Sequence, residues 1–251
     1  MSPILHVMRH GQGYHSSAVT KDGHLLRDPF LTEKGKQQCR DRCKAFTRHG
    51  HIELLVASPM RRAIQTCQLS FQPAVERGLV IVCLPHAEEV SDAPADTGSP
   101  VNVLQAEFGS AVNFDHLEEG WFKHDGEFAI DPKAVKARAT KLRQWLKARP
   151  EKEIAMVSHG FFNHYLCEEV DDDGQQTTPW WNEAELRTYT FSDDENDNIA
   201  KIYETPESLT ARGASAGNER PMSPKVNIPS TRGSNPDEHY IKPDDSATAS
   251  R

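Results

Sequence analysis

The sequence predicts an α/β fold with a mostly parallel central sheet flanked by helices on both faces. Short, continuous apolar runs alternate with helical segments through residues 1–204. Such runs are typical of strands covered on both faces, and this alternation favours a parallel sheet. Three of the runs end in Arg or His, with Gly or Pro opening the next element. Ligands bind beyond the carboxyl ends of strands in open α/β sheets, so we expect a site at that edge.

Six strands are expected, and the first four are the continuous apolar runs. In chain order the strands are 4–8, 52–57, 79–84 and 153–158, followed by a late pair near 186–192 and 198–203.

The first two helices are expected from their start signals. Thr32 is suited to cap a helix that runs to about Phe46. Ser58 followed by Pro59 predicts an N-cap and a proline at the first helical position, for a helix that runs to about Leu69.

Two later helices are expected on the same grounds. The pair Asp131-Pro132 repeats the start signal, and its helix should extend to about Lys147. Another helix should follow Gly160 and end near Glu168.

The chain divides into a folded part and a tail. Residues 1–204 are expected to form one catalytic domain, in which 86–130 is an insertion over the site that is partly helical near 101–108. From residue 205 the composition shifts to Ser, Pro, Gly, Asn and charged residues. Such a segment buries too little apolar surface to offset its ordering entropy, so 205–251 is predicted to be disordered.

Charge and hydropathy exclude several classes of partner. The net charge of −8 argues against non-specific binding to nucleic acid or to an anionic membrane. No apolar run approaches the roughly 20 residues that span a bilayer, and the first run is too short for a signal peptide. We therefore expect no nucleic-acid or membrane partner. The sequence carries no signal for an oligomeric state.

The cysteines point to a reducing compartment. They are five in number, scattered, and without a CxxC pair: Cys39, Cys43, Cys67, Cys83 and Cys167. Free thiols are favoured over a disulfide or metal site. This predicts a cytoplasmic protein, with a nuclear location as the alternative.

The strand ends supply groups that suit a phosphoryl site. Arg9 and His10 leave the first strand together, Arg62 lies in the first turn of its helix, and His159 precedes the helix start at Gly160. The N-terminus of a helix favours a bound anion, and one arginine side chain can donate hydrogen bonds to two phosphoryl oxygens at once. A neutral imidazole is a good nucleophile toward phosphorus, and neighbouring arginines should keep His10 neutral.

A general acid is needed for the departing alkoxide, and carboxyl groups follow the third strand. The candidates are Glu88, Glu89 and Asp92. Arg61 is expected to face solvent beside Arg62. The other histidines lack metal-ligand spacing, and no nucleotide-binding glycine motif is present, so neither a metal nor a cofactor is expected.

Four motifs together resemble those of the histidine phosphatase superfamily, in its phosphoglycerate-mutase-like branch. They come in the family's order, within about residues 4–192. They are MRHG at 8–11, DPFLTEKG at 28–35, SPMRRAIQT at 58–66 and VSHG at 157–160. The run EVSDAPADTGS at 89–99 resembles that of uncharacterised fungal members.

The resemblance implies roles for individual residues. His10 would be phosphorylated, and Arg9, Arg62 and His159 would bind the phosphoryl group. Glu89 best fits the family's proton donor, and the family needs no metal. Among the residues that contact substrate we place the motif glycines and one serine: Gly11, Gly160 and Ser16. Ser16 stands where many members have an asparagine.

These features favour a phosphatase acting on a small phosphomonoester through a phosphohistidine. A mutase-type phosphotransferase is the alternative, but the 86–130 segment offers few cationic residues for a second acidic group. A recruited enzyme of other chemistry, or a non-catalytic binding module on the same fold, also stays open.

Overall fold

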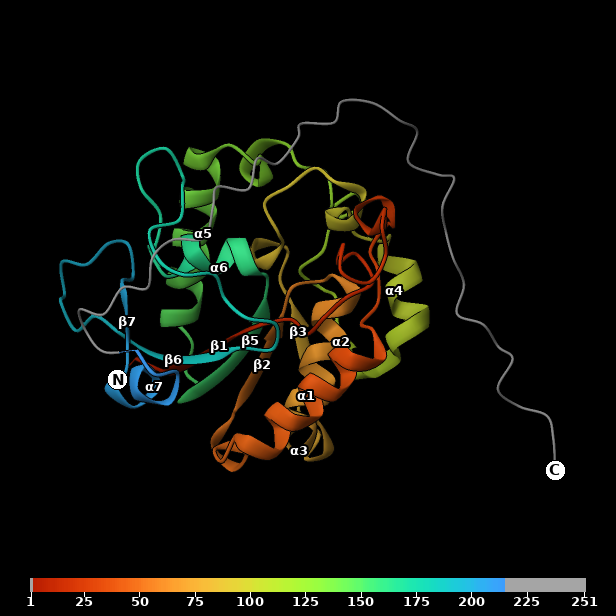
Figure 1. Cartoon of the computed structure of the whole chain (residues 1–251). Coiled ribbons are helices and arrows are strands. Elements are labelled where there is room, and N and C mark those ends of the chain that lie inside the picture. Colours follow the sequence, from red (N-terminus) through yellow and green to blue (C-terminus); the bar gives the residue numbers. More distant parts are fainter. Residues whose placement is uncertain (1, 215–251) are drawn as a thin grey trace.

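A seven-stranded sheet forms the centre of the molecule, in the order β4-β3-β2-β5-β1-β6-β7 (Figure 1). The computed structural model describes residues 2–214. The strands are β1 (Ile4–Arg9), β2 (Leu54–Ala57), β3 (Ile81–Cys83), β4 (Val112–Asn113), β5 (Glu153–Ser158), β6 (Leu186–Phe191) and β7 (Ile202–Glu204). Strands β1 to β5 pair in parallel, and only β6 and β7 are antiparallel. The expected mostly parallel sheet is confirmed.

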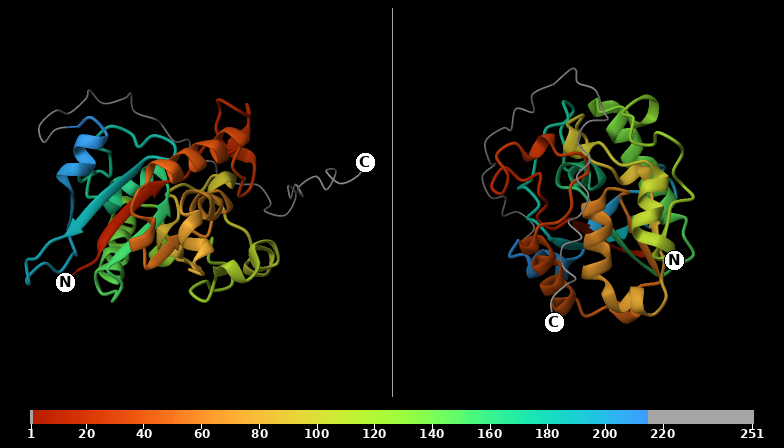
Figure 2. Two further views of the ribbon diagram at one scale, coloured as in Figure 1. Left: turned by 90° about the horizontal axis from the view of Figure 1, so that it is seen from below. Right: turned by 90° about the vertical axis from the view of Figure 1, so that its right-hand side faces the viewer.

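Helices cover both faces of this sheet (Figures 1 and 2). They are α1 (Glu33–Ala45), α2 (Arg61–Ser70), α3 (Gln72–Glu76), α4 (Val101–Phe108), α5 (Pro132–Lys147), α6 (Gly160–Leu166) and α7 (Pro206–Ala211). The short α3 and the two-residue strand β4 were not expected from the sequence, because elements of this length leave no periodicity to read.

The core lies on the two sides of the sheet, as the alternation along β5 shows. Ile154 and Met156 belong to the buried cluster that includes the apolar residues of α5 and α6. Ala155 and Val157 belong to the cluster on the other face, with α2. Successive side chains of a strand point to opposite faces, so a strand covered on both faces must be apolar throughout. The continuous apolar runs in the sequence have this origin.

Side-chain caps fix where two of the helices begin. The Thr32 hydroxyl accepts a hydrogen bond from the Gly35 N–H (3.0 Å), and the Asp131 carboxylate accepts one from the Ala134 N–H (3.1 Å). Both caps confirm the predicted starts, and each is worth about 1 kcal/mol.

The expected cap of α2 is wrong. The helix begins at Arg61 with Met60 as its N-cap residue, and Ser58 lies outside it. The Ser58 hydroxyl is instead hydrogen-bonded to the ring of His159 at 2.8 Å. A local start signal was overridden by a contact from a distant part of the chain.

The fold continues past the boundary expected at residue 204. Thr205 caps α7, and Ser208 of that helix accepts a hydrogen bond from the Thr188 N–H of β6 (3.0 Å). The prediction of disorder is therefore wrong for 205–214, where a capped helix docks on β6, next to the edge strand β7. The rest of the expected tail, 215–251, lies outside the described residues.

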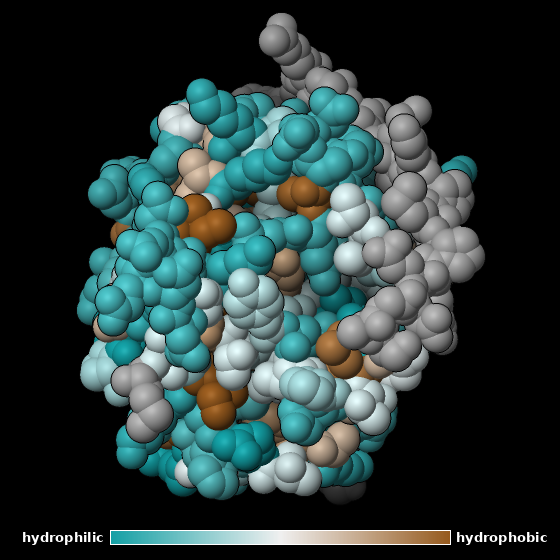
Figure 3. Space-filling model, turned by 90° about the vertical axis from the view of Figure 1, so that its left-hand side faces the viewer, coloured by the Kyte–Doolittle hydropathy of each residue, from teal (hydrophilic) through white to brown (hydrophobic). Residues whose placement is uncertain are grey.

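The surface and the cysteines are consistent with the composition. The face in Figure 3 is mainly hydrophilic, with hydrophobic side chains in small, separate groups. Among residues 2–214, no helix has the length and apolar character needed to cross a membrane. All five cysteines are free.

Three neighbouring strands bring the candidate site residues to one edge. The His10 N–H donates to the Ser158 carbonyl (3.0 Å), and the Ser58 N–H donates to the Val157 carbonyl (2.9 Å). Strands β1 and β5 are in register, with Arg9 opposite Ser158. The residues that follow β1, β2 and β5 therefore meet at the carboxyl edge of the sheet.

Candidate active site

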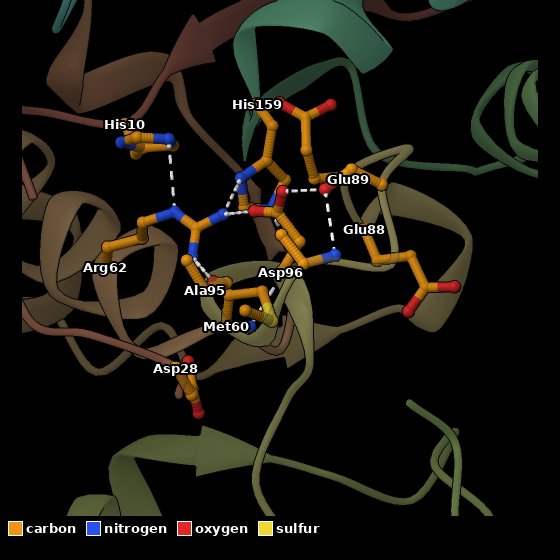
Figure 4. A network of polar contacts seen from close by, with 12 residues as sticks. His10, Asp28, Met60, Arg62, Glu88, Glu89, Ala95, Asp96 and His159 are labelled. Atoms are coloured by element: carbon orange, nitrogen blue, oxygen red, sulfur yellow. Dashed lines mark hydrogen bonds and ion pairs between the residues drawn. The ribbon is translucent and has the colours of Figure 1, made fainter. Parts of the chain in front are cut away.

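His10 lies at the end of β1 with its ring buried. Its Nδ1 is 2.7 Å from the Gly11 carbonyl, and its Nε2 is 3.2 Å from Nε of Arg62. Arginine only donates, so Nε2 of His10 is the acceptor and the proton resides on Nδ1, which donates to Gly11. The Nε2 lone pair therefore points toward Arg62, as a nucleophile at this edge requires (Figure 4).

His159 stands beside it, with the two ring centroids 5.1 Å apart. Nδ1 of His159 is 3.1 Å from Nη2 of Arg62, and its Nε2 is 2.8 Å from the Ser58 hydroxyl. The same argument makes Nδ1 the acceptor and Nε2 the donor to Ser58. Both imidazoles thus present an unprotonated nitrogen to one guanidinium.

Arg62 connects the two rings from the first turn of α2. Its Nε and Nη2 face His10 and His159, respectively. These two nitrogens form one edge of the planar fork, the geometry that binds two phosphoryl oxygens at once. A phosphoryl group between the two imidazoles would lie on that edge.

Both imidazoles are kept neutral by their surroundings. Burial, and then the charge of Arg62, hold the pKa of His10 well below its usual value. The same two causes, in the same order, lower the pKa of His159. Neutral His10 is the form with a free electron pair, so the nucleophile needs no deprotonation near pH 7.

Arg9 is held from two sides at the end of β1. Its Nη1 donates to the Trp181 carbonyl, and its side chain passes close to Gly160. A Cβ at Gly160 would lie 2.9 Å from Nε of Arg9. A side chain at position 160 would therefore collide with Arg9.

The loop after His10 is fixed by α1 and α2. The Gly11 N–H donates to the Thr66 hydroxyl at 3.0 Å. A Cβ at Gly11 would lie 2.8 Å from the Gly35 carbonyl oxygen, and a Cβ at Gly35 would lie 2.1 Å from the Gln12 carbonyl oxygen. The two glycines allow the loop and the start of α1 to pack backbone to backbone, which explains their presence in two of the motifs.

Glu89 lies at the N-terminus of α6. Its carboxylate accepts hydrogen bonds from the N–H groups of Phe162 (2.9 Å) and Phe161 (3.3 Å). Burial raises the pKa of Glu89, and the charge of Asp96 raises it further, against the opposing effect of Arg62. A half-buried carboxyl group with a raised pKa on the loop that holds Arg62 has the properties of a proton donor.

The neighbouring Glu88 points away from His159 and Arg62 (Figure 4). It is fully buried and forms an ion pair with Arg138 at 2.9 Å. Burial raises the pKa of Glu88 to about 8, although Arg138 opposes this. Arg138 also donates to the carbonyl oxygens of Glu88 (3.0 Å) and Glu89 (3.3 Å), so the pair anchors this stretch of backbone.

Asp96 is a site residue that the sequence reasoning missed. It ends the 3₁₀ turn η4 (Pro94–Asp96), and its Oδ1 accepts a hydrogen bond from Nη2 of Arg62 at 2.7 Å. The signal available was an acidic residue in the run 89–99, but nothing in its spacing points to Arg62. By contrast Asp92, one of the three candidate acids, is exposed.

His15 is a second residue that was missed. Its ring lies edge-on to that of His10, with centroids 5.3 Å apart. Burial, followed by the nearby arginines, lowers the pKa of His15 to about 2. The Ser16 N–H instead closes a turn onto the Gly13 carbonyl. The ring of His15 is therefore a neighbour of His10, and binding by Ser16 stays a prediction.

Arg61 does not face solvent as expected. It is 4% exposed, with Nε 2.7 Å from Glu107 and Nη1 3.4 Å from Asp28. The Arg61 N–H also donates to Asp28 (2.9 Å). The two adjacent arginines have separate functions: Arg62 faces the histidines, while Arg61 ties α2 to two other segments.

Within the described residues, no group of three or more His, Cys, Asp or Glu side chains could hold a metal ion. The site has two arginines as its cationic groups, and the expectation of a metal-free reaction stays a prediction.

Relatives of this chain include phosphatases and mutase-like proteins. A probable phosphatase of Schizosaccharomyces pombe is 29% identical over 160 residues, which are 62% of this chain and 73% of the relative. A phosphoglycerate mutase-like protein of Arabidopsis thaliana is 29% identical over 210 residues, covering 67% and 75% of the two chains.

Solved structures share the fold at low sequence identity. YhfR of Bacillus stearothermophilus has a TM-score of 0.55 at 17% identity, over 82% of this chain and 97% of that one. A mycobacterial glucosyl-3-phosphoglycerate phosphatase with bound vanadate has a TM-score of 0.51 at 17% identity, over 81% and 97%.

A family model also matches most of the chain. Residues 5–205 match the histidine phosphatase superfamily (branch 1), a span that includes both histidines, both arginines and Glu89. The chain belongs to the histidine phosphatase superfamily.

Proposed function

We propose that this protein is a phosphatase that hydrolyses a small phosphomonoester through a phosphohistidine on His10, with Glu89 as proton donor and without a metal. The observation that carries the proposal is the Arg62 guanidinium, whose Nε and Nη2 face an unprotonated nitrogen of His10 (3.2 Å) and of His159 (3.1 Å). Names of relatives such as the probable phosphatase of Schizosaccharomyces pombe support it.

In the first step, the Nε2 lone pair of His10 attacks phosphorus and the bond to the ester oxygen breaks. In the free site, the Arg62 Nε–H donates a hydrogen bond to Nε2 of His10. A phosphoryl oxygen of the substrate accepts that hydrogen bond in place of His10. Arg9 and Arg62 stabilise the charge that develops on the phosphoryl oxygens. Glu89 gives its proton to the departing alkoxide, which leaves as an alcohol.

In the second step, water attacks the phosphohistidine. The Glu89 carboxylate now accepts a proton from that water, whose oxygen bonds to phosphorus as the P–N bond breaks. Inorganic phosphate leaves, and neutral His10 and protonated Glu89 are restored. Burial favours the protonated form of Glu89, which the first step needs, while the Phe161 and Phe162 amides stabilise the carboxylate formed between the steps.

The mutase-type phosphotransferase remains the alternative, since one relative is named a phosphoglycerate mutase-like protein. Hydrolysis is favoured because the cations that line this site are few and engaged. Arg61, for example, is paired with two carboxylates and is not directed at the histidines.

We also propose a cytoplasmic or nuclear location, with no nucleic-acid or membrane partner. Five free cysteines and the net charge of −8 support this. Fractionation of cells that express the tagged chain tests the location, and recovery in a membrane pellet would contradict it.

The experiment is phosphate release from a panel of phosphomonoesters in the presence of EDTA. Wild type is compared with His10→Ala and with His51→Ala, which removes an exposed histidine. We expect release by wild type and His51→Ala and none by His10→Ala. Rapid quenching at high pH should trap a phosphohistidine in wild type and in His51→Ala, but not in His10→Ala. A phosphohistidine formed without net release of phosphate would instead favour the mutase. Neither phosphohistidine nor release on any ester would favour a recruited activity or a binding module.

A further inference from the structure

Two protein groups hold the far end of Arg62. Nη1 donates to the Ala95 carbonyl oxygen at 2.7 Å, and Nη2 donates to the Asp96 carboxylate at 2.7 Å. Both acceptors come from the turn η4, and Figure 4 shows them on the side of the guanidinium away from His10. The edge formed by Nη1 and Nη2 is thus occupied by η4, while the edge formed by Nε and Nη2 faces the histidines.

This arrangement fixes the plane of the guanidinium. An arginine side chain has about 2 kcal/mol of rotamer entropy, and Arg62 is only 1% exposed. Two acceptors at the far edge remove the freedom of rotation that would otherwise move the near edge away from the phosphoryl position. A positioning error of about 1 Å in such a group can lower a rate 100-fold.

Asp96 is itself held in place within the same loop. Its Oδ2 accepts a hydrogen bond from the Ser91 hydroxyl at 2.5 Å, and the Ser91 oxygen accepts one from the Ala93 N–H at 3.3 Å. The loop therefore closes on itself before it reaches Arg62. A carboxylate that only balanced charge at the surface would not need this support.

The same carboxylate lies close enough to Glu89 to affect its charge. After burial, the charge of Asp96 is the largest cause that raises the pKa of Glu89. Three arginines place positive charge near the Glu89 carboxylate and oppose the effect of Asp96. They are Arg62 of α2, Arg9 of β1 and Arg138 of α5.

We propose that Asp96 is a positioning residue of this site, which orients Arg62 toward the phosphoryl group. Its carboxylate, held between Arg62 and Ser91, also places a negative charge on the loop that carries Glu89. The inference rests on the proposed phosphatase function. It also gives the 86–130 segment a role in catalysis, because Glu89 and Asp96 both lie on one loop of that segment.

The test separates the hydrogen bond from the charge. Asp96→Ala removes both, and we expect kcat to fall about 100-fold. Asp96→Asn keeps an acceptor for Arg62 but removes the charge, so kcat at low pH should stay within a few-fold of wild type. Because a general acid must be protonated, activity falls as pH rises through its pKa. Asp96→Asn lowers the pKa of Glu89, so this alkaline limb should move to lower pH.

Two further variants control the result. Asp125→Asn removes an exposed carboxylate of the same segment and should behave as wild type. Ser91→Ala removes only the support of Asp96 and should lower kcat less than Asp96→Ala does. If Asp96→Ala does not fold, as judged by circular dichroism and thermal unfolding, Asp96→Asn and Ser91→Ala still carry the test.

The outcomes distinguish this inference from the proposed function. Wild-type kcat in Asp96→Ala, or an unmoved alkaline limb in Asp96→Asn, would overturn the inference while leaving the phosphatase intact. If wild type releases no phosphate, calorimetric binding of inorganic phosphate replaces turnover. Asp96→Ala should then bind phosphate at least about tenfold more weakly than wild type does, and equal affinity would overturn the inference.

Discussion

The buried ion pair between Glu88 and Arg138 gives the sharpest stability prediction. The two side chains are fully buried, 2.9 Å apart, and Arg138 also lies 4.8 Å above the ring of Phe162. Arg138→Met keeps an apolar stem of similar length but removes the donors to Glu88 and to two carbonyl oxygens. Breaking one side of a buried pair costs about 3–5 kcal/mol. For a domain of this size that corresponds to a fall in Tm of roughly 6–20 °C.

The loss should depend on pH. In the wild-type fold, burial raises the pKa of Glu88 from 4.5 to about 8, and removal of Arg138 raises it further. A raised pKa in the folded state means that the folded protein binds more protons than the unfolded chain above pH 4.5. Stability therefore decreases as pH rises through this range, by up to about 1.4 kcal/mol per pH unit. The defect of Arg138→Met should be smallest near pH 5 and largest near pH 9.

Urea unfolding at pH 5, 7 and 9 measures this directly. The control is Lys133→Met, which changes an exposed cation of the same helix and should cost less than about 0.5 kcal/mol. The double variant Glu88→Gln/Arg138→Met has no charge at this pair, so the pH dependence of stability that arises from Glu88 should be lost. A destabilisation by Arg138→Met below 1 kcal/mol, or one equal at pH 5 and 9, would refute the reasoning.

Three further predictions concern the site. Glu89→Gln should slow the hydrolysis of alkyl phosphates by roughly 100-fold or more and that of aryl phosphates much less, because an acidic phenol leaves without a proton. Asp92→Asn should hydrolyse both classes as wild type does. The reverse pattern would assign the proton donor to Asp92. Gly160→Ala should lower kcat/KM without unfolding the protein, since the added Cβ displaces Arg9, and unchanged kinetics would contradict that contact. Arg61→Met should lower the free energy of unfolding by about 3 kcal/mol in a denaturant titration, and a loss below 1 kcal/mol would contradict its buried pairing.

Much of the fold could be predicted because the sheet is covered on both faces. Strands buried on two sides must be apolar throughout, and β1, β2, β3 and β5 therefore stand out in the sequence. The convergence of the candidate catalytic groups follows from the same logic, because His10 and His159 come directly after parallel neighbours in the sheet. The structure brings both of them to Arg62, as expected.

The parts that could not be predicted depend on contacts between distant segments. Ser58 has the residue type and position of an N-cap, but its hydroxyl is hydrogen-bonded to a histidine 101 residues away. Arg61 and Arg62 are adjacent and identical, and only their distant carboxylate partners give them different roles. Asp96 lies on a loop without periodicity, so no pattern connects it with Arg62.

The in-register pairing of β1 with β5 has a consequence for how this protein can change. The separation of the two imidazoles derives from the spacing of adjacent strands, about 4.8 Å, and their ring centroids are 5.1 Å apart. Backbone hydrogen bonds between the strands therefore set the distance between the two imidazoles. The segments 13–27 and 88–100, which contain no strand of the sheet, are not constrained by it in this way. Under the proposed function, replacement of residues in such loops can change the substrate, while the spacing of the two imidazoles is inherited with the sheet.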